Sequence, residues 1–246
     1  MKNRLKKGLP FALAALIILP CISFKAYAAG LDINLNGTGT DTLEILETLT
    51  FLALLPTILI MTTCFTRIVI VFSFVRNALG LQQTPPNQVL VGLSLILSIF
   101  IMTPVLNRIN NEAYKPYKAE QITQEEFVRR ASDPMKTFML KQTKKDDLDM
   151  FVGLAKIKNA DSVRDIPITV VIPAFVTSEL KRAFTIGFLI YIPFLVIDLI
   201  VSSTLMSMGM MMLPPAMISL PFKLLLFVLA DGWGLLIKSL VASFNM

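Results

Sequence analysis

Four long apolar segments constrain the fold of this chain more than any other feature of its sequence. They cover residues 43–75, 89–106, 183–206 and 216–230, and the second of them has no charged residue. Lipid offers a backbone no hydrogen-bond partners, so segments this long and apolar are expected to be helices. Because 54% of all residues are hydrophobic and only 16% are charged, the sequence predicts an all-α membrane protein.

The apolar segments pair into two long hydrophobic helical hairpins, which we expect at residues 43–106 and 167–246. The turn of the first hairpin contains Gly80 and a double proline, which end one helix and start the next. The first segment is longer than one membrane span of about 20 residues. We therefore expect a long tilted helix, or one that faces lipid only in part, with a kink at Pro56.

The first 28 residues have the layout of a cleavable signal peptide. A basic stretch precedes an apolar run over residues 9–24 and small residues that end at Ala28. An uncleaved first membrane helix is the alternative, which the two prolines in the short apolar run disfavour. Residues 29–42 are rich in Gly, Thr and Asn without periodicity, and they predict a flexible lead-in.

The composition argues against several classes of protein. The chain has no histidine, and Cys64 is the only cysteine after residue 28, so imidazole metal sites, histidine-based catalytic triads and an internal disulfide of the mature chain are excluded. We accordingly expect no enzyme, metal site or cofactor. The first 28 residues hold five basic and no acidic residues, so the net charge falls from +6 to +1 on cleavage. This small charge gives no electrostatic basis for binding nucleic acid.

Residues 107–166 carry most of the charges of the mature chain and predict a small helical module inserted between the hairpins. A cleaved leader would place this module on the extracytoplasmic side and both hairpin turns on the cytoplasmic side. The expected starts of its three helices are a capping box formed by Thr123 and Glu126, the pair Asp133–Pro134, and either Asp146 or Asp147.

Five charged residues inside or beside the apolar segments are candidates for burial. Asp198 lies twelve positions before Met210 and Lys223 lies twelve positions after Met211, so a hairpin that turns between the two methionines brings the charges level. We expect these charges to face each other or to share a polar network; the alternative is that each faces a partner subunit or a water-filled interior. The other candidates are Arg67, Glu179 and Lys181.

The charges of Glu179, Lys181 and Arg182 allow two interpretations. They form either a ring of charge in an oligomer or a solvated helix face. One sequence alone favours the solvated face, because charged helix faces are most often exposed.

Two long stretches of sequence resemble one known family. FTRIVIVFSFVRNALGLQQTPPNQVL and IPAFVTSELKRAFTIGFLIYIPFLVIDLIVSSTLMSMGMMMLPPAMISLPFKLLLFVLADGWGLL are similar to the FliP family, the flagellar subunit of the type III protein export gate. The resemblance covers about residues 45–106 and 165–240. Arg182, directly after Lys181, departs from the family pattern, in which a less charged residue is expected.

This resemblance implies an assembly in the bacterial inner membrane, at the flagellar basal body. FliP-family proteins form homo-oligomers that join FliQ and FliR in a closed helical cone, with FlhB wrapped at its entrance, and unfolded flagellar subunits are exported through the cone. The resemblance also implies that the hairpins do not simply cross the bilayer. Virulence type III secretion systems use a similar subunit, and the cleavable leader favours the flagellar branch.

On this resemblance the uncharged turn LMSMGMMMLPP, residues 205–215, becomes a candidate pore gate. Five of the thirteen methionines lie in it, and their flexible side chains can seal around peptides of changing shape. Two alternatives are a Cu(I) transporter that uses soft thioether ligands and a tight turn that is merely packed with methionine. The expected gate residues are Met206, Met208, Gly209, Met210, Met211, Met212, Pro214 and Pro215.

Overall fold

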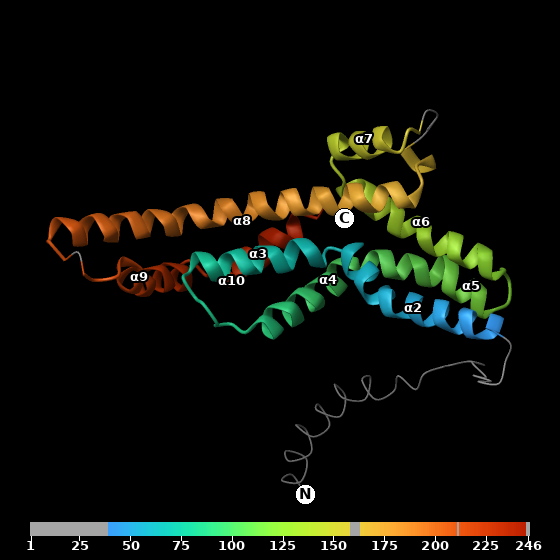
Figure 1. Cartoon of the computed structure of the whole chain (residues 1–246), viewed down its shortest axis with the longest axis horizontal. Coiled ribbons are helices and arrows are strands. Elements are labelled where there is room, and N and C mark those ends of the chain that lie inside the picture. The colour runs from blue at the N-terminus through green and yellow to red at the C-terminus, as the bar shows by residue number, and fades with distance from the viewer. Residues whose placement is uncertain (1–38, 158–162, 211, 245–246) are drawn as a thin grey trace, which may run out of the picture. The chain divides into compact units, whose positions relative to one another are not determined.

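The computed structural model describes residues 39–157, 163–210 and 212–244, and every regular element in these ranges is a helix (Figure 1). The expected fold class, an all-α membrane protein, is confirmed. The expected signal peptide, and the expected lead-in up to residue 38, lie outside the described residues. The chain divides into two compact units between Ala53 and Leu54.

The described helices differ widely in length, and the longest has 40 residues. In chain order they are α2 (Gly39–Met61), α3 (Phe65–Ala78), α4 (Asn87–Ile109), the π-helix η1 (Asn110–Tyr114), α5 (Lys115–Lys118), α6 (Gln124–Gln142), α7 (Lys145–Leu154), the 3-10 helix η2 (Val163–Asp165), α8 (Ile168–Ser207), α9 (Pro215–Leu229) and α10 (Gly232–Ala242).

The first apolar segment forms two helices, and the expectation of one helix kinked at Pro56 is wrong. α2 runs through Pro56, and the helix breaks at Thr62 and Thr63 before α3 begins. The hydroxyl of Thr62 donates to the carbonyl oxygen of Ile58, one turn back, at 2.9 Å. The same kind of bond occurs within intact helices, as from Thr185 to Lys181 in α8, so it accompanies the break and does not explain it. At the other end, residues 39–42 of the expected flexible lead-in already belong to α2.

The charged segment contains fewer helix starts than its sequence indicated. Half of the expected capping box is present, because the hydroxyl of Thr123 accepts a hydrogen bond from the Glu126 amide at 3.3 Å. The Glu126 carboxylate accepts from Arg129 and Arg130. The helix start expected at Asp133–Pro134 is wrong, since α6 continues through both residues. Proline removes a single ladder bond, and here its ring is buried against the rest of the unit, which offsets that loss. The third helix, α7, starts at Lys145.

α3 is the helix around which the core of the second unit is built. One of its faces is buried along its whole length and packs along α8, while α4 covers part of the remainder (Figure 1). The buried positions recur three or four residues apart, as an amphipathic helix requires. The fully buried apolar side chains of this face are Ile68, Val71, Phe72, Val75 and Ala78.

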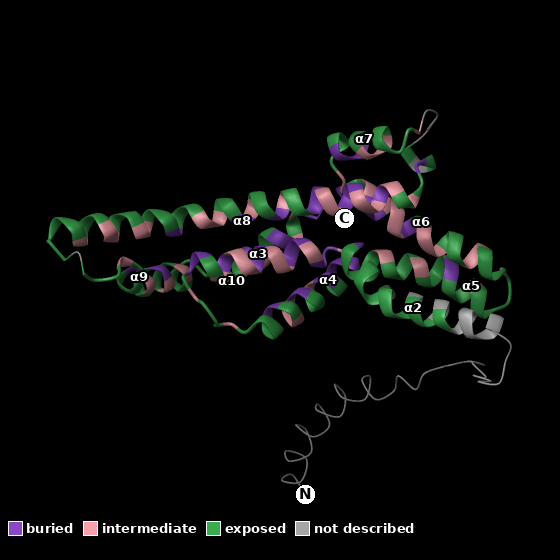
Figure 2. Cartoon of the chain, viewed as in Figure 1, coloured by how far each residue is buried: buried purple, intermediate pink, exposed green. Residues whose placement is uncertain are grey.

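α8 changes character along its length (Figure 2). Its inner half, residues 168–187, packs against α3, α6 and α7 and contains most of its buried residues. In its outer half, residues 188–207, Phe194 is the only buried residue, although α9 packs against α8. Large apolar side chains such as Leu199 and Ile200 are exposed there. The outer half therefore carries apolar surface that a single chain leaves uncovered.

Two described helices are long and apolar enough to cross a membrane. One is the continuous rod of α4, η1 and α5 from Asn87 to Lys118, and the other is α8. Two bent helix pairs would raise the number of spans to four if each pair counted as one. One of these pairs is α9 with α10, which are bent by 62° at Asp231, a residue in the left-handed backbone region with φ 49°.

Candidate functional site

A buried arginine ties together the helices of the inner core. Arg67 on α3 and Glu179 on α8 form an ion pair in which neither side chain is exposed. Nε of Arg67 donates to Oε2 of Glu179 at 2.8 Å, while Nη2 donates to Oε1 of Glu179 and to Oε1 of Gln142, the latter at 3.3 Å. Charges this deep persist only when they are paired and hydrogen-bonded. Residues of α3, α6 and α8 supply those partners here.

The end of α10 completes the same cluster. Nη1 of Arg67 donates to the carbonyl oxygen of Ser243 at 3.2 Å and to its hydroxyl oxygen at 2.9 Å. The ring of Phe244 lies 3.8 Å from the guanidinium carbon, a cation–π contact. All five N–H donors of Arg67 thus have acceptors. Sequence reasoning identified Arg67 and Glu179 but missed Gln142, Ser243 and Phe244, because no local pattern links residues that meet only in the tertiary fold.

A second polar cluster joins α7 to the inner half of α8. The hydroxyl of Ser178 donates to Oδ2 of Asp147 at 2.6 Å and accepts from the backbone amide of Lys144 at 3.0 Å. Lys181 donates to the other carboxylate oxygen of Asp147. Hydrogen bonds, first from Lys181 and then from Ser178, hold the pKa of Asp147 below its ordinary value. α7 is therefore docked by a charged group that is ionised at neutral pH.

The structure corrects two expectations about the charges on α8. Glu179 is fully buried, so a solvated face is the wrong interpretation for this residue. The side chain of Lys181 is 55% exposed, so its expected burial is also wrong. Side chains two residues apart in a helix point about 200° away from each other. Glu179 and Lys181 therefore lie on opposite sides of α8.

The charge pair of the outer half is present as the sequence predicted. Nζ of Lys223 on α9 lies 2.6 Å from Oδ2 of Asp198 on α8, and it also donates to the carbonyl oxygen of Ala78 at 3.2 Å. The hydroxyl of Ser219 donates to Oδ1 of Asp198 at 2.6 Å. The Lys223 side chain is 7% exposed and that of Asp198 is 35% exposed. This pair links α9 to α8 and to the end of α3, and its carboxylate remains partly exposed.

The methionine turn, residues 206–215, begins with a glycine cap. The Gly209 amide donates to the carbonyl of Met206 and the Met210 amide to that of Leu205, each at 3.0 Å. These two bonds form a Schellman motif, whose central residue needs a left-handed backbone. Gly209 supplies it with φ 75°, and this explains why a glycine interrupts the methionines. Pro214 and Pro215 then start α9, with Pro215 in its first turn.

The side chains of the methionine turn are exposed in the isolated chain. Met212 is 99% exposed, and Met206, Met208 and Met210 are also on the surface, whereas Met211 lies outside the described residues. The turn stands at the end of the α8–α9 hairpin (Figure 1). Its apolar side chains therefore form an uncharged tip that this chain does not bury.

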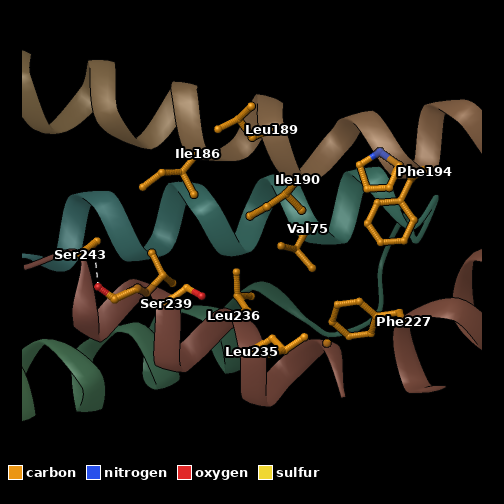
Figure 3. Close-up of a pocket in the computed structure, with 13 residues that line it drawn as sticks. Val75, Ile186, Leu189, Ile190, Phe194, Phe227, Leu235, Leu236, Ser239 and Ser243 are labelled. Atoms are coloured by element: carbon orange, nitrogen blue, oxygen red, sulfur yellow. Dashed lines mark hydrogen bonds between the residues drawn. The ribbon is translucent and has the colours of Figure 1, made fainter. Parts of the chain in front are cut away.

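An apolar groove, which sequence reasoning missed, runs between α8 and α10. Its volume is about 460 Å³, and Val75 of α3 lies at its base between the two longer walls (Figure 3). Phe227 of α9 lies at one end and Ser243 at the other, next to the Arg67 cluster. Four of its lining residues, from Leu189 to Phe194, belong to the outer half of α8. Its other lining residues are Ile186, Leu189, Ile190, Pro193, Phe194, Gly232, Leu235, Leu236, Ser239 and Leu240.

The charged side chains of these three clusters form ion pairs with one another. In the described parts of the chain, no group of three or more His, Cys, Asp or Glu side chains could hold a metal ion. The arrangement holds helices together, and it leaves an apolar tip and an apolar groove on the surface.

Comparison with known proteins gives one consistent family. A family model described as the FliP family matches residues 48–240. The flagellar biosynthetic protein FliP of Bacillus subtilis is 56% identical over 205 residues, which cover 83% of this chain and 93% of that protein. Its counterparts in Pectobacterium carotovorum and Aquifex aeolicus are 55% identical over 211 residues and 54% over 213 residues. Each match covers 85% of this chain, with 82% of the first protein and 89% of the second.

Proposed function

Because this chain belongs to the FliP family, we propose that several copies of it surround a protein-export pore and close the pore with their methionine turns. The chain is a membrane component of the flagellar type III export apparatus, as its matched relatives are named for flagellar biosynthesis. The proposal places this component in the bacterial inner membrane, within the flagellar basal body. Its role is structural and not enzymatic.

The observation that carries the proposal is the exposed, uncharged methionine turn. A pore for unfolded chains must close without a fixed ligand and must open around side chains of every shape. Methionine suits this task because it is unbranched, flexible and polarizable. Met210 and Met212 are exposed at the end of the hairpin, where copies arranged around an axis could bring them together.

The exposed apolar surface supports assembly with other subunits. A large contiguous apolar patch on a chain is covered in the assembled state either by partner subunits or by lipid. The outer half of α8 and the adjoining α9 carry such a patch. We propose that further copies of this chain, together with FliQ and FliR, cover it, and that FlhB binds at the entrance of the pore through which unfolded flagellar subunits leave.

Alanine substitution of Met210 and Met212 tests the proposed gate. The variant should assemble with its partners and leave vesicles or cells permeable to small solutes, because alanine is too short to close the axis. A matched control is Met150→Ala, on α7, where the methionine is as exposed as Met210 but lies outside the turn. Normal permeability in the double variant, or failed assembly without a leak, would mean that the methionines only pack the turn.

A further inference from the structure

The methionine turn gathers an unusual number of accessible thioether sulfurs. Its described methionines are exposed, and so is Met217 in the following turn of α9. Met102 and Met139, by contrast, are buried in the core, and the other exposed methionines of the described chain, Met61 and Met150, stand singly. The exposed set at the turn comprises Met206, Met208, Met210, Met212 and Met217.

We propose that the methionine turn is a site of reversible oxidation, at which hydrogen peroxide or a related two-electron oxidant opens the gate. The sulfur lone pair attacks one peroxide oxygen, the S–O bond forms as the O–O bond breaks, and water leaves. Sulfur is oxidised by two electrons and peroxide is reduced by two. The product, methionine sulfoxide, is returned to methionine by thiol-dependent sulfoxide reductases.

The surroundings of the turn decide the consequence of this reaction. No residue from 199 to 222 is charged, and the hydroxyls of Ser203, Thr204 and Ser207 already donate to backbone carbonyls. The turn therefore offers few donors for a new sulfoxide oxygen. A strong acceptor without a donor is unfavourable in an apolar contact, and it draws water instead. Every copy around the pore would bring several sulfoxides to the same place. The seal consequently becomes wet and leaks.

This inference rests on the proposed function of the turn as a gate, and the test separates the two. The complete export gate, purified with its partner subunits, is reconstituted in vesicles and treated with hydrogen peroxide while the release of a trapped small dye is followed. Peptide mass spectrometry then locates every added oxygen atom. The turn methionines should be oxidised first, whereas Met102 and Met139 should stay reduced.

A leucine variant supplies the resistant comparison. Leucine at Met206, Met208, Met210, Met211, Met212 and Met217 keeps the apolar bulk and removes every sulfur of the turn and of the start of α9. The Schellman cap does not depend on these side chains, because Gly209 and backbone bonds form it. Dye release from the native gate should rise several-fold on oxidation and fall again after treatment with sulfoxide reductases. The leucine variant should not respond, while Met150→Leu on α7 should respond like the native chain.

Two results would overturn the inference and leave the gate proposal standing. One is complete oxidation of the turn with unchanged dye release, and the other is oxidation of Met150 while the turn stays reduced. A failure of the gate proposal looks different, because Met210→Ala with Met212→Ala would then leave the untreated gate tight. If the leucine variant is itself leaky, reversal by the reductases in the native gate still decides the matter.

Discussion

Each half of α8 holds a charge pair among apolar helices, and the two pairs are built differently. In the inner half, Arg67 and Glu179 are fully buried and every donor of the guanidinium has an acceptor. In the outer half, Asp198 is 35% exposed, and Lys223 has two acceptors for its three donors. The inner pair is complete within one chain, whereas the outer pair is not.

This difference indicates that the inner half of the chain is a rigid frame and that the outer half is a surface for assembly. Helices α3, α6, α8 and α10 meet at the inner cluster, where a satisfied polar network fixes one arrangement. Around the outer pair the apolar side chains stay exposed, and the methionine turn lies beyond it. The inner half therefore stabilises the chain, and the outer half carries the turn that we propose closes the pore.

Breaking the inner pair should have the largest effect on the chain. Glu179→Leu leaves the Arg67 guanidinium buried without its carboxylate, and removal of one partner of a buried pair costs about 3–5 kcal/mol. We expect the variant to unfold or to fail to accumulate in detergent, as thermal unfolding and expression yield would show.

The double variant Arg67→Met with Glu179→Leu is the matched control. It removes both charges and keeps similar volume, so it should recover most of the lost stability. Equal loss in the single and double variants would show that the charge left behind is not the cause.

The next largest effect should follow from changing Phe244. Phe244→Leu keeps an apolar side chain but removes the ring that covers the Arg67 guanidinium, a desolvated contact worth about 2 kcal/mol. Phe244→Trp should retain most of the stability, because indole is the best partner for a cation. Thermal unfolding of both variants gives the comparison, and equal melting temperatures would show that the ring contributes only bulk.

The outer pair should be more tolerant. Asp198→Lys and Lys223→Asp should each destabilise the folded chain less than Glu179→Leu does, because the carboxylate of the outer pair is partly solvated, and each should impair assembly with the partner subunits. The exchanged double variant should restore part of the assembly. It regains the ion pair but not the bonds from Ser219 and to Ala78. Native mass measurement of the complexes checks this, and no gain over the single variants would show that direct pairing is unimportant.

The smallest effect concerns the docking of α7 on the inner half. The pKa of Asp147 is lower in the folded chain than in the unfolded chain, so its contribution is complete above the unfolded value of about 4 and is lost as the pH falls through the folded value. Because Lys181 is solvated, we expect less than about 1 kcal/mol. The protection factors of the α7 amides, which take the slower intrinsic exchange in acid into account, should fall as the pH is lowered.

Two variants of α7 sharpen this measurement. Asp147→Asn should show low protection factors for the α7 amides already at neutral pH and little further fall in acid. Asp149→Asn, at an exposed position of the same helix, should behave like the native chain. Unchanged protection in Asp147→Asn would contradict the role of this carboxylate.

The sequence predicted the helices and the outer charge pair well because both follow from local or symmetric patterns. Apolar length predicted membrane helices, and the equal distance of Asp198 and Lys223 from the turn predicted their pairing. The break at Thr62 and the continuity of α6 through Pro134 were not predicted, since a proline signal is weaker than the packing that surrounds it.

The partners of Arg67 were beyond sequence reasoning for a different reason. Gln142 and Ser243 are ordinary polar residues near helix ends, and only the tertiary fold brings them to the guanidinium. The apolar groove between α8 and α10 is likewise formed by the bend at Asp231, which has no periodic signal. The burial of Glu179 depends on the rotation of α8 against α3, which one helix pattern does not determine.

Cross-linking at the tip of the hairpin tests the central claim most directly. Met212→Cys places one thiol at a side chain that is 99% exposed, while the native Cys64 is buried. Within the complete export gate, mild oxidation should join two copies of the chain through Cys residues at position 212. Leu154→Cys, exposed on α7, and the unsubstituted chain are the controls. Linked copies at position 212 alone are the predicted result; turns that never cross-link in the assembled gate would contradict closure of the pore by methionine turns.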